Sequence, residues 1–229
     1  MQDAADKTGE WLAYCGACPV PEIANVLQRL EIPFHQITGV LESHDVCWKE
    51  LNAWLRAAEV VHALQHGRLG LMGHYYSGML DIATDLAQIS GRFGLHIEML
   101  EVDELSALRR DISDIDLKKK LAALADLFQI SDDCTAEELE RAARTSVALD
   151  RLAETKQLDL LTYYYKGSGI FENEDTLSSI ILAASMLTGN HVPVAGEYEV
   201  KNVVAMKVMD LLGAGGSFTN TMRMISKMI

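Results

Sequence analysis

Short apolar runs alternate along this chain with longer segments in which apolar residues recur every three or four positions. The runs that predict buried strands from residue 67 onward are Arg68–Gly73, Leu95–Leu100, Leu158–Tyr165 and Val192–Glu197. Segments of helical periodicity lie between these runs and after the last one. Alternation of this kind is typical of α/β folds with a parallel sheet. We therefore expect a doubly wound α/β protein.

The helical segments of this region are marked by apolar residues at helical spacing. The sets are Ile82, Leu86, Ile89 and Phe93; Leu117, Leu121, Leu124 and Phe128; Leu177, Ile180, Ala184 and Leu187; and Val204, Val208 and Leu211. Thr135 followed by Glu138 predicts a capping box that opens a further helix, running to about Thr155. Gly213 is expected to end the last helix.

The N-terminal part has fewer elements. We expect a strand at Trp11–Cys15, a helix opening on Pro21 and a strand at Pro33–Val40. A long helix over Asp45–His66 should follow, with a buried face that includes Trp48 and Leu55. Two parallel strands bury too little surface to stand alone. The expected organisation is a partial N-terminal α/β unit over 1–44, a connecting helix over 45–66, a more complete α/β domain over 67–218 and a tail over 219–229.

Composition and charge narrow the function classes. The 229 residues are 49% hydrophobic, enough for one large core or two modest ones. A net charge of −13 argues against nucleic acids and anionic membranes, because like charges repel. No apolar run approaches the roughly 20 residues of a membrane helix, and the start of the chain is polar and acidic, unlike a secretory signal. We expect a cytoplasmic protein that handles a small molecule, with neither a nucleic acid nor a membrane as partner.

Cysteine and glycine patterns suggest further chemistry but do not require it. The four cysteines are too scattered for a disulfide framework. Cys15 and Cys18 form a C-x-x-C pair, which could be a redox pair or half a zinc site, although two small buried residues are the favoured interpretation. The glycines of Gly213–Ser217 follow a helix instead of preceding one, so they do not predict a phosphate loop.

Polar side chains follow three of the predicted strands. His74 and Tyr76 follow the first, a loop with Lys166, Glu172, Glu174 and Asp175 follows the third, and Glu197 follows the fourth. Each taken alone is best explained as a solvated loop. In doubly wound sheets, however, ligands bind beyond the carboxyl ends of the strands. If these strands are adjacent, His74, Tyr76, Lys166 and Glu197 should meet at one pocket.

Three segments carry a resemblance to a known family. Val194–Phe218 resembles the stretch that enters the active site in the L-arabinose and L-fucose isomerase superfamily. Leu69–Leu86 and Leu161–Asp175 are similar to segments of its arabinose-isomerase-like members. The resemblance runs from about Ala13 to Phe218, in matching order and spacing. It implies an L-fucose isomerase-like α/β fold and interconversion of an aldose with its ketose.

The resemblance also implies a metal site. Family members hold a divalent cation, usually Mn²⁺, with two acidic side chains and a histidine, and Mn²⁺ suits hard oxygen donors. Glu197 falls on the first acidic ligand and is also a candidate catalytic base, while His74, Tyr76 and Lys166 are candidate sugar-binding residues. Asn220 stands where the second acid is expected, and the histidine belongs to a C-terminal β-rich domain that has no counterpart here.

Two function hypotheses remain open. The first is a metal-dependent aldose–ketose isomerase of which this chain is a truncated part, inactive alone because it has one of three metal ligands. The resemblance implies homo-oligomers for the intact family. The second is a non-catalytic α/β module that binds a sugar or a partner chain. An adjoining reading frame that resumes the family pattern after Gly215–Phe218 would indicate the first.

Overall fold

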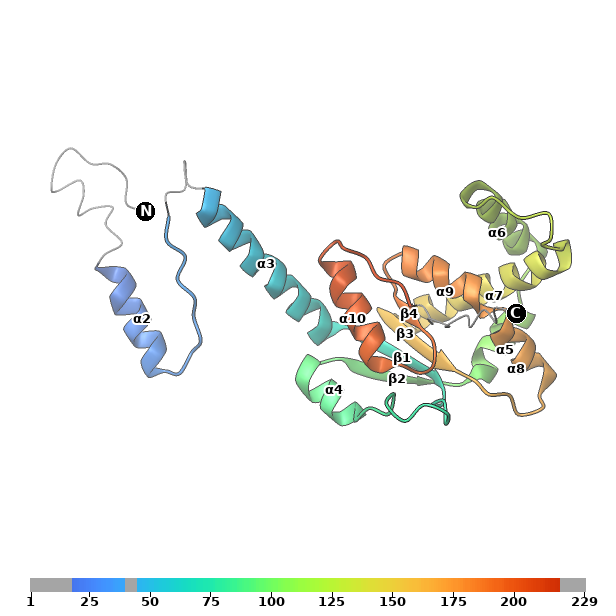
Figure 1. Cartoon of the computed structure of the whole chain (residues 1–229), viewed down its shortest axis with the longest axis horizontal. Coiled ribbons are helices and arrows are strands. Elements are labelled where there is room, and N and C mark those ends of the chain that lie inside the picture. The colour runs from blue at the N-terminus through green and yellow to red at the C-terminus, as the bar shows by residue number, and fades with distance from the viewer. Residues whose placement is uncertain (1–17, 40–44, 219–229) are drawn as a thin grey trace, which may run out of the picture. The chain divides into compact units, whose positions relative to one another are not determined.

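The computed structural model describes residues 18–39 and 45–218 (Figure 1). The chain divides into two compact units, Met1–Glu59 and Val60–Ile229, and the boundary falls within one long helix. Each unit is described by itself below.

The N-terminal unit contains helix α2 (Pro19–Arg29), which has proline in its first turn. Proline is well suited to this position because its fixed φ matches the helix and its missing N–H would have no partner there. The predicted helix is thus confirmed. The predicted strand at Pro33–Val40 is wrong over residues 33–39, which form no strand. A strand requires a hydrogen-bonded neighbour, and these residues pair with none in the part of the unit that is described. The other predicted strand, Trp11–Cys15, lies outside the described residues.

Helix α3 (Asp45–His66) confirms the predicted long helix. Its predicted buried face is wrong, because Trp48 and Leu55 are 44% and 52% exposed. The buried residues of this helix are Cys47 and Leu64. Periodicity shows that a helix has an apolar face, but burial depends on a second surface that covers it.

The C-x-x-C pair is tested only at its second residue. Cys18, expected to be buried, is exposed just before α2, a helix without buried residues. Its predicted partner Cys15 lies outside the described residues.

The larger unit is built on a four-stranded parallel sheet. Its strands are β1 (Arg68–Gly73), β2 (His96–Leu100), β3 (Leu160–Tyr164) and β4 (Val194–Ala195), in the order β2-β1-β3-β4. All three pairings are parallel, with Leu71 opposite Thr162 and Thr162 opposite Ala195. The predicted α/β fold with a parallel sheet is confirmed.

The helices of this unit are α4 (Leu86–Phe93), α5 (Val102–Arg110), α6 (Asp114–Leu127), α7 (Ala136–Lys156), α8 (Phe171–Ser178), α9 (Ile180–Gly189) and α10 (Val200–Leu211). Helix α5 was not expected, because its nine residues include few apolar ones. The single helix predicted through Leu177 and Leu187 is two helices. The Ser179 hydroxyl bonds the carbonyls of Asp175 and Thr176 at their junction, which competes with the regular helical pattern.

Local signals account for several helix ends. Thr135 and Glu138 form the predicted capping box at the start of α7. Asp85 caps α4, and Gly94 ends it with a left-handed backbone at φ 77°. Gly213, at φ 77°, follows the last turn of α10, as predicted.

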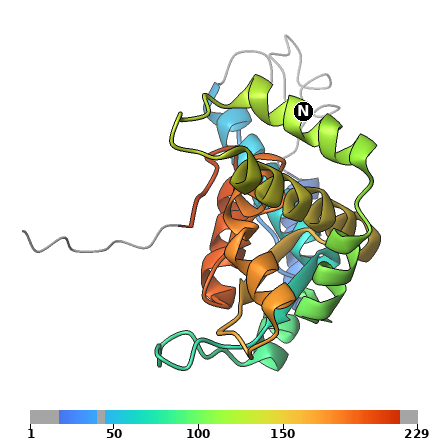
Figure 2. The same ribbon diagram turned by 90° about the vertical axis from the view of Figure 1, so that its right-hand side faces the viewer.

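Helices cover both faces of the sheet, and the alternation of side chains along each strand supplies both cores. On one face, Met72 and Leu161 pack with residues of α5, α6, α7 and α9. On the other face, Leu71 and Leu160 pack with residues of α4, α10 and the last turns of α3. Figure 2 shows α10 (red) and α5 (green) on opposite sides of the strands. The strand ends are therefore the part of the sheet that remains open to a ligand.

Candidate functional site

The carboxyl ends of β1, β3 and β4 lie side by side because these strands are adjacent and parallel. Gly73 is opposite Tyr164, and the next residue, His74, donates its backbone N–H to the Tyr164 carbonyl (3.1 Å). The Thr162 hydroxyl donates to the Ala195 carbonyl (3.0 Å), which holds the short β4 against β3. The chain therefore leaves β4 at a fixed place beside the end of β3.

A pocket with a volume of about 690 Å³ lies at this edge. Its walls come from the end of β3, the loop after it, α8, the start of α9 and the turn after β4. The lining residues are Tyr163, Tyr164, Tyr165, Lys166, Gly167, Glu174, Leu177, Ser178, Ile181, Gly196, Glu197 and Phe218. The size suits a small molecule, and the polar groups in it are phenols, carboxylates and one ammonium group.

Glu197 stands on a tight turn between β4 and α10. Both Glu197 and Tyr198 have left-handed backbones, at φ 60° and 61°. Such conformations cost roughly 1–3 kcal/mol each in non-glycine residues and persist where surrounding contacts determine them. Those contacts are present: the Tyr198 N–H donates to the Tyr163 carbonyl (3.0 Å), and the Tyr198 ring, 2% exposed, packs edge-on against Tyr75. The turn holds the Glu197 carboxylate at the pocket wall.

The tyrosines near Glu197 remain protonated over an unusually wide pH range. Burial, and then the negative charge of Glu197, raise the pKa of Tyr163 to about 12. Burial, Tyr76 and Glu197 also raise the pKa of Tyr164. Both phenols are therefore neutral near pH 7 and can donate hydrogen bonds to the oxygens of a polar ligand.

The structure brings the predicted site residues together only in part. Lys166 and Glu197 line the pocket. His74 and Tyr76 lie at the same edge but are not among the lining residues; their rings pack against Tyr164, which does line the pocket, with centroids 5.4 and 4.8 Å from its centroid. The His74 ring donates from Nδ1 to the Tyr75 carbonyl (3.0 Å). Their predicted roles in sugar binding stay predictions.

Sequence reasoning missed several pocket residues. Glu174, Leu177, Ser178 and Ile181 line it from α8 and α9, where Glu174 had been noted only as part of a polar loop. On α8, Leu177 and Ser178 are three and four positions after Glu174, which places these three side chains on one face of that helix. The sequence places Leu177 in a predicted core helix, and periodicity alone does not separate a pocket-facing residue from a buried one.

The fit of these residues to a manganese site is incomplete. In residues 18–39 and 45–218, no three histidine, cysteine, aspartate or glutamate side chains are grouped so that they could hold a metal ion. The pocket lining offers one further carboxylate, Glu174, which already accepts the Gly169 N–H, while the phenols and the ammonium group are poor partners for a hard dication. Asn220, the residue at the position expected for a second acid, lies outside the described residues. The described part of the chain does not form the three-ligand site that the resemblance implies.

Two L-arabinose isomerases are similar to the chain, and no protein-family model matches it. The L-arabinose isomerase of Nocardioides sp. (strain ATCC BAA-499 / JS614) is 27% identical over 110 residues, which are 48% of this chain and 22% of that protein. The L-arabinose isomerase of Shewanella baltica (strain OS223) is 23% identical over 187 residues, 78% of this chain and 36% of that protein. The matched part thus spans well under half of the length of these relatives. Over these matched regions, the chain is similar to L-arabinose isomerases.

Proposed function

We propose that this chain forms part of the sugar pocket of an aldose–ketose isomerase, with Glu197 as the catalytic carboxylate. The observation that carries the proposal is the place of Glu197: a left-handed turn at the carboxyl edge of a parallel sheet, in the wall of a pocket that also contains Lys166. The similarity to two L-arabinose isomerases supports the choice of substrate class.

The chemistry of the pocket agrees with this reaction. Conversion of an aldose to its ketose moves one proton from C2 to C1 and one from O2 to O1. A carboxylate beside C1 and C2 can take the first proton and return it. Neutral phenols and the Lys166 ammonium group can donate hydrogen bonds to the sugar oxygens, including the oxygen on which negative charge develops. In this proposal Glu197 moves the proton, while Tyr163 and Lys166 bind and orient the sugar.

Metal dependence is a further part of the proposal. Glu197 would supply one ligand of a Mn²⁺ site, and the remaining ligands would come from outside residues 18–39 and 45–218. We expect the chain alone, with L-arabinose and Mn²⁺, to form no ketose. An isolated carboxylate binds a dication weakly because the ion keeps most of its water.

Binding of L-arabinose to the purified chain, followed by ligand-observed NMR, tests the pocket. Glu197→Gln should weaken binding, while Glu154→Gln, which changes an exposed carboxylate on α7, should leave it unchanged. Equal binding by wild type and Glu197→Gln, or no binding by wild type, would contradict the assignment of the pocket.

A non-catalytic sugar-binding module is the second candidate, and the lack of a three-ligand group in the described residues favours it. A test of the two functions joins this chain to the segments that a longer L-arabinose isomerase has outside the matched region. The combined protein is then assayed for ketose formation from L-arabinose with Mn²⁺. Turnover that disappears in Glu197→Ala supports the isomerase. Sugar binding without any turnover in that combination supports the module.

A further inference from the structure

Helix α8 has one face in the pocket and the other in a polar network. Glu174, Leu177 and Ser178 line the pocket. The two residues of α8 that are buried, Asn173 and Thr176, are both polar. A two-turn helix without a buried apolar side chain gains little from the hydrophobic effect. Half-buried Leu177 packs against the core, and polar contacts with the neighbouring helices supply the rest of what positions α8.

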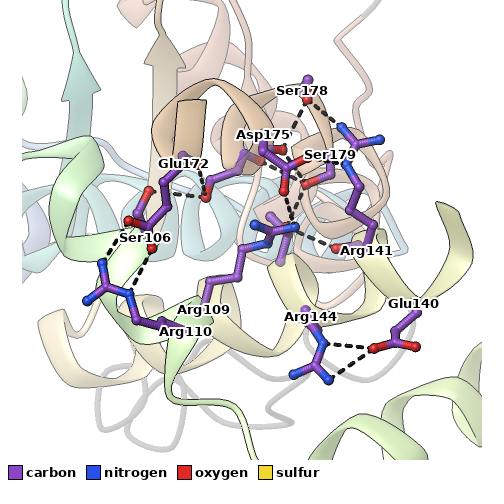
Figure 3. A network of polar contacts seen from close by, with 12 residues as sticks. Ser106, Arg109, Arg110, Glu140, Arg141, Arg144, Glu172, Asp175, Ser178 and Ser179 are labelled. Atoms are coloured by element: carbon purple, nitrogen blue, oxygen red, sulfur yellow. Dashed lines mark hydrogen bonds and ion pairs between the residues drawn. The ribbon is translucent and has the colours of Figure 1, made fainter. Parts of the chain in front are cut away.

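Asp175 is the centre of these contacts (Figure 3). Its carboxylate bonds Arg109 of α5, at 2.6 Å from Nη2, and also the Nε of Arg141 of α7. The three side chains are only 21%, 13% and 33% exposed. Ion pairs shielded from water in this way are weakened less by solvent than exposed pairs, and loss of one partner leaves the other charge poorly compensated. Asp175 thus joins α8 to two different helices at once.

Other bonds support the same placement. The Ser106 hydroxyl of α5 donates to Asn173 Oδ1 (2.7 Å), and the Asn173 amide donates to the Asp103 carboxylate. Arg141 also donates to the Ser178 hydroxyl, one turn beyond Asp175. Glu172 and Arg110 form a bidentate pair nearer the solvent, with side chains 41% and 64% exposed.

The pocket face of α8 in turn holds the loop that carries Lys166. Glu174 Oε1 accepts the backbone N–H of Gly169 (2.9 Å). The same oxygen lies so close to Gly167 that a β-carbon there would be 2.8 Å from it. The loop between β3 and α8 is thus folded around the Glu174 carboxylate, and Lys166, Gly167 and Glu174 line the pocket together.

From these contacts we infer that Asp175 is a positioning residue for the sugar pocket. Arg109 and Arg141 fix Asp175, Asp175 fixes α8, and the adjacent Glu174 fixes the loop of Lys166. The last step, from the loop to sugar binding, rests on the proposed function. The contacts from Arg109 and Arg141 through Asp175 and α8 to the loop do not depend on the proposed function.

Asp175→Asn tests this chain of contacts because it keeps the shape of the side chain and removes its charge. NMR of the full chain should show faster hydrogen exchange and a shifted resonance for the Gly169 amide, while the amides of the α7 core around Leu149 keep their protection. Glu174→Ala, which removes the acceptor of the Gly169 N–H, should produce the same local change, and the double variant should add little to either single one. Arg141→Gln removes the Arg141–Asp175 pair by changing the α7 residue. It replaces Asp175→Asn as the test if that variant does not fold.

Glu172→Gln is the matched control. It removes the pair of Glu172 with Arg110, which also joins α8 to α5 but is exposed to solvent. The Gly169 amide should not respond to it. An unchanged Gly169 amide in both Asp175→Asn and Arg141→Gln would overturn the inference, as would an equal response in Glu172→Gln.

L-Arabinose titrations of the same variants separate this inference from the proposed function. We expect weaker binding in Asp175→Asn and unchanged binding in Glu172→Gln. If the Gly169 amide responds but wild type binds no L-arabinose, the positioning role stands and the proposed function fails. If the Gly169 amide does not respond, the positioning role fails whatever the sugar does.

Discussion

Gly167 lies so close to the Glu174 carboxylate that a β-carbon at position 167 would force the carboxylate to move. Gly167 has φ +93°, and an added β-carbon would be 2.8 Å from Glu174 Oε1. The carboxylate can swing away only by giving up its bond from the Gly169 N–H. This pair of residues sets the shape of the loop that bears Lys166.

Gly167→Ala should therefore destabilise the chain by about 1–2 kcal/mol, the usual cost of a left-handed backbone in a residue with a side chain. Urea unfolding followed by circular dichroism measures this cost. Gly91→Ala is the control, because Gly91 lies in α4 with nothing within 4 Å of an added β-carbon. That change should be neutral or stabilising by up to about 1 kcal/mol. Equal effects at the two positions would contradict the close approach.

Tyr163 and Tyr198 should titrate well above the ordinary tyrosine pKa of about 10. Burial is the main cause that raises the pKa of each to about 12, and Glu197 adds to the effect on Tyr163. Near-ultraviolet absorbance of tyrosinate during an alkaline titration measures these values. Glu197→Gln should lower the pKa of Tyr163, but not to the ordinary value near 10, because burial remains.

The same two groups make the folded state sensitive to alkali. Their protons are bound more tightly in the folded than in the unfolded chain, so the stability they contribute is complete below about pH 10. It is lost as the pH rises from about 10 toward the folded pKa values of about 12. Urea unfolding at a series of alkaline pH values should show stability falling through this window. Titration of both groups near pH 10 would contradict the prediction.

The capping box of α7 should contribute measurably to stability. Thr135 accepts the Glu138 N–H at 3.2 Å, and Glu138 accepts the Thr135 N–H at 3.4 Å. Thr135→Ala should cost about 0.5–2 kcal/mol in urea unfolding. Thr135→Ser should retain most of the cap. Thr155→Ala, at an exposed position near the other end of the helix, should not destabilise.

Leu161 should be among the most sensitive core positions. It is fully buried in β3 and packs with helices of one face of the sheet. Leu161→Ala should cost about 2–5 kcal/mol, because a cavity adds to the lost burial. Leu127→Ala, at the end of α6 where the side chain is 65% exposed, should change stability by less than about 0.5 kcal/mol. Comparable losses at both positions would argue against this core.

Local sequence signals determined most of the secondary structure of the larger unit. The apolar run Arg68–Gly73 became β1 with the predicted bounds, and Thr135 with Glu138 started α7 as expected. Alternation of strands and helices also sufficed to predict a parallel sheet and to name its carboxyl edge as the place for a site. Glu197 and Lys166 were found in this way. These features depend on residues that are neighbours in the chain, so the chain itself displays them.

Tertiary structure decided what is covered and what faces the pocket. Trp48 and Leu55 have helical spacing but are exposed, since no surface in the described part of their unit buries them. His74 and Lys166 both follow strands, yet only Lys166 lines the pocket, while His74 packs edge-on against Tyr164. The pairing of Asp175 with two arginines, more than 30 residues away in sequence, has no local signal at all. Burial and ion pairing depend on segments that only the fold brings together, and no periodicity records them.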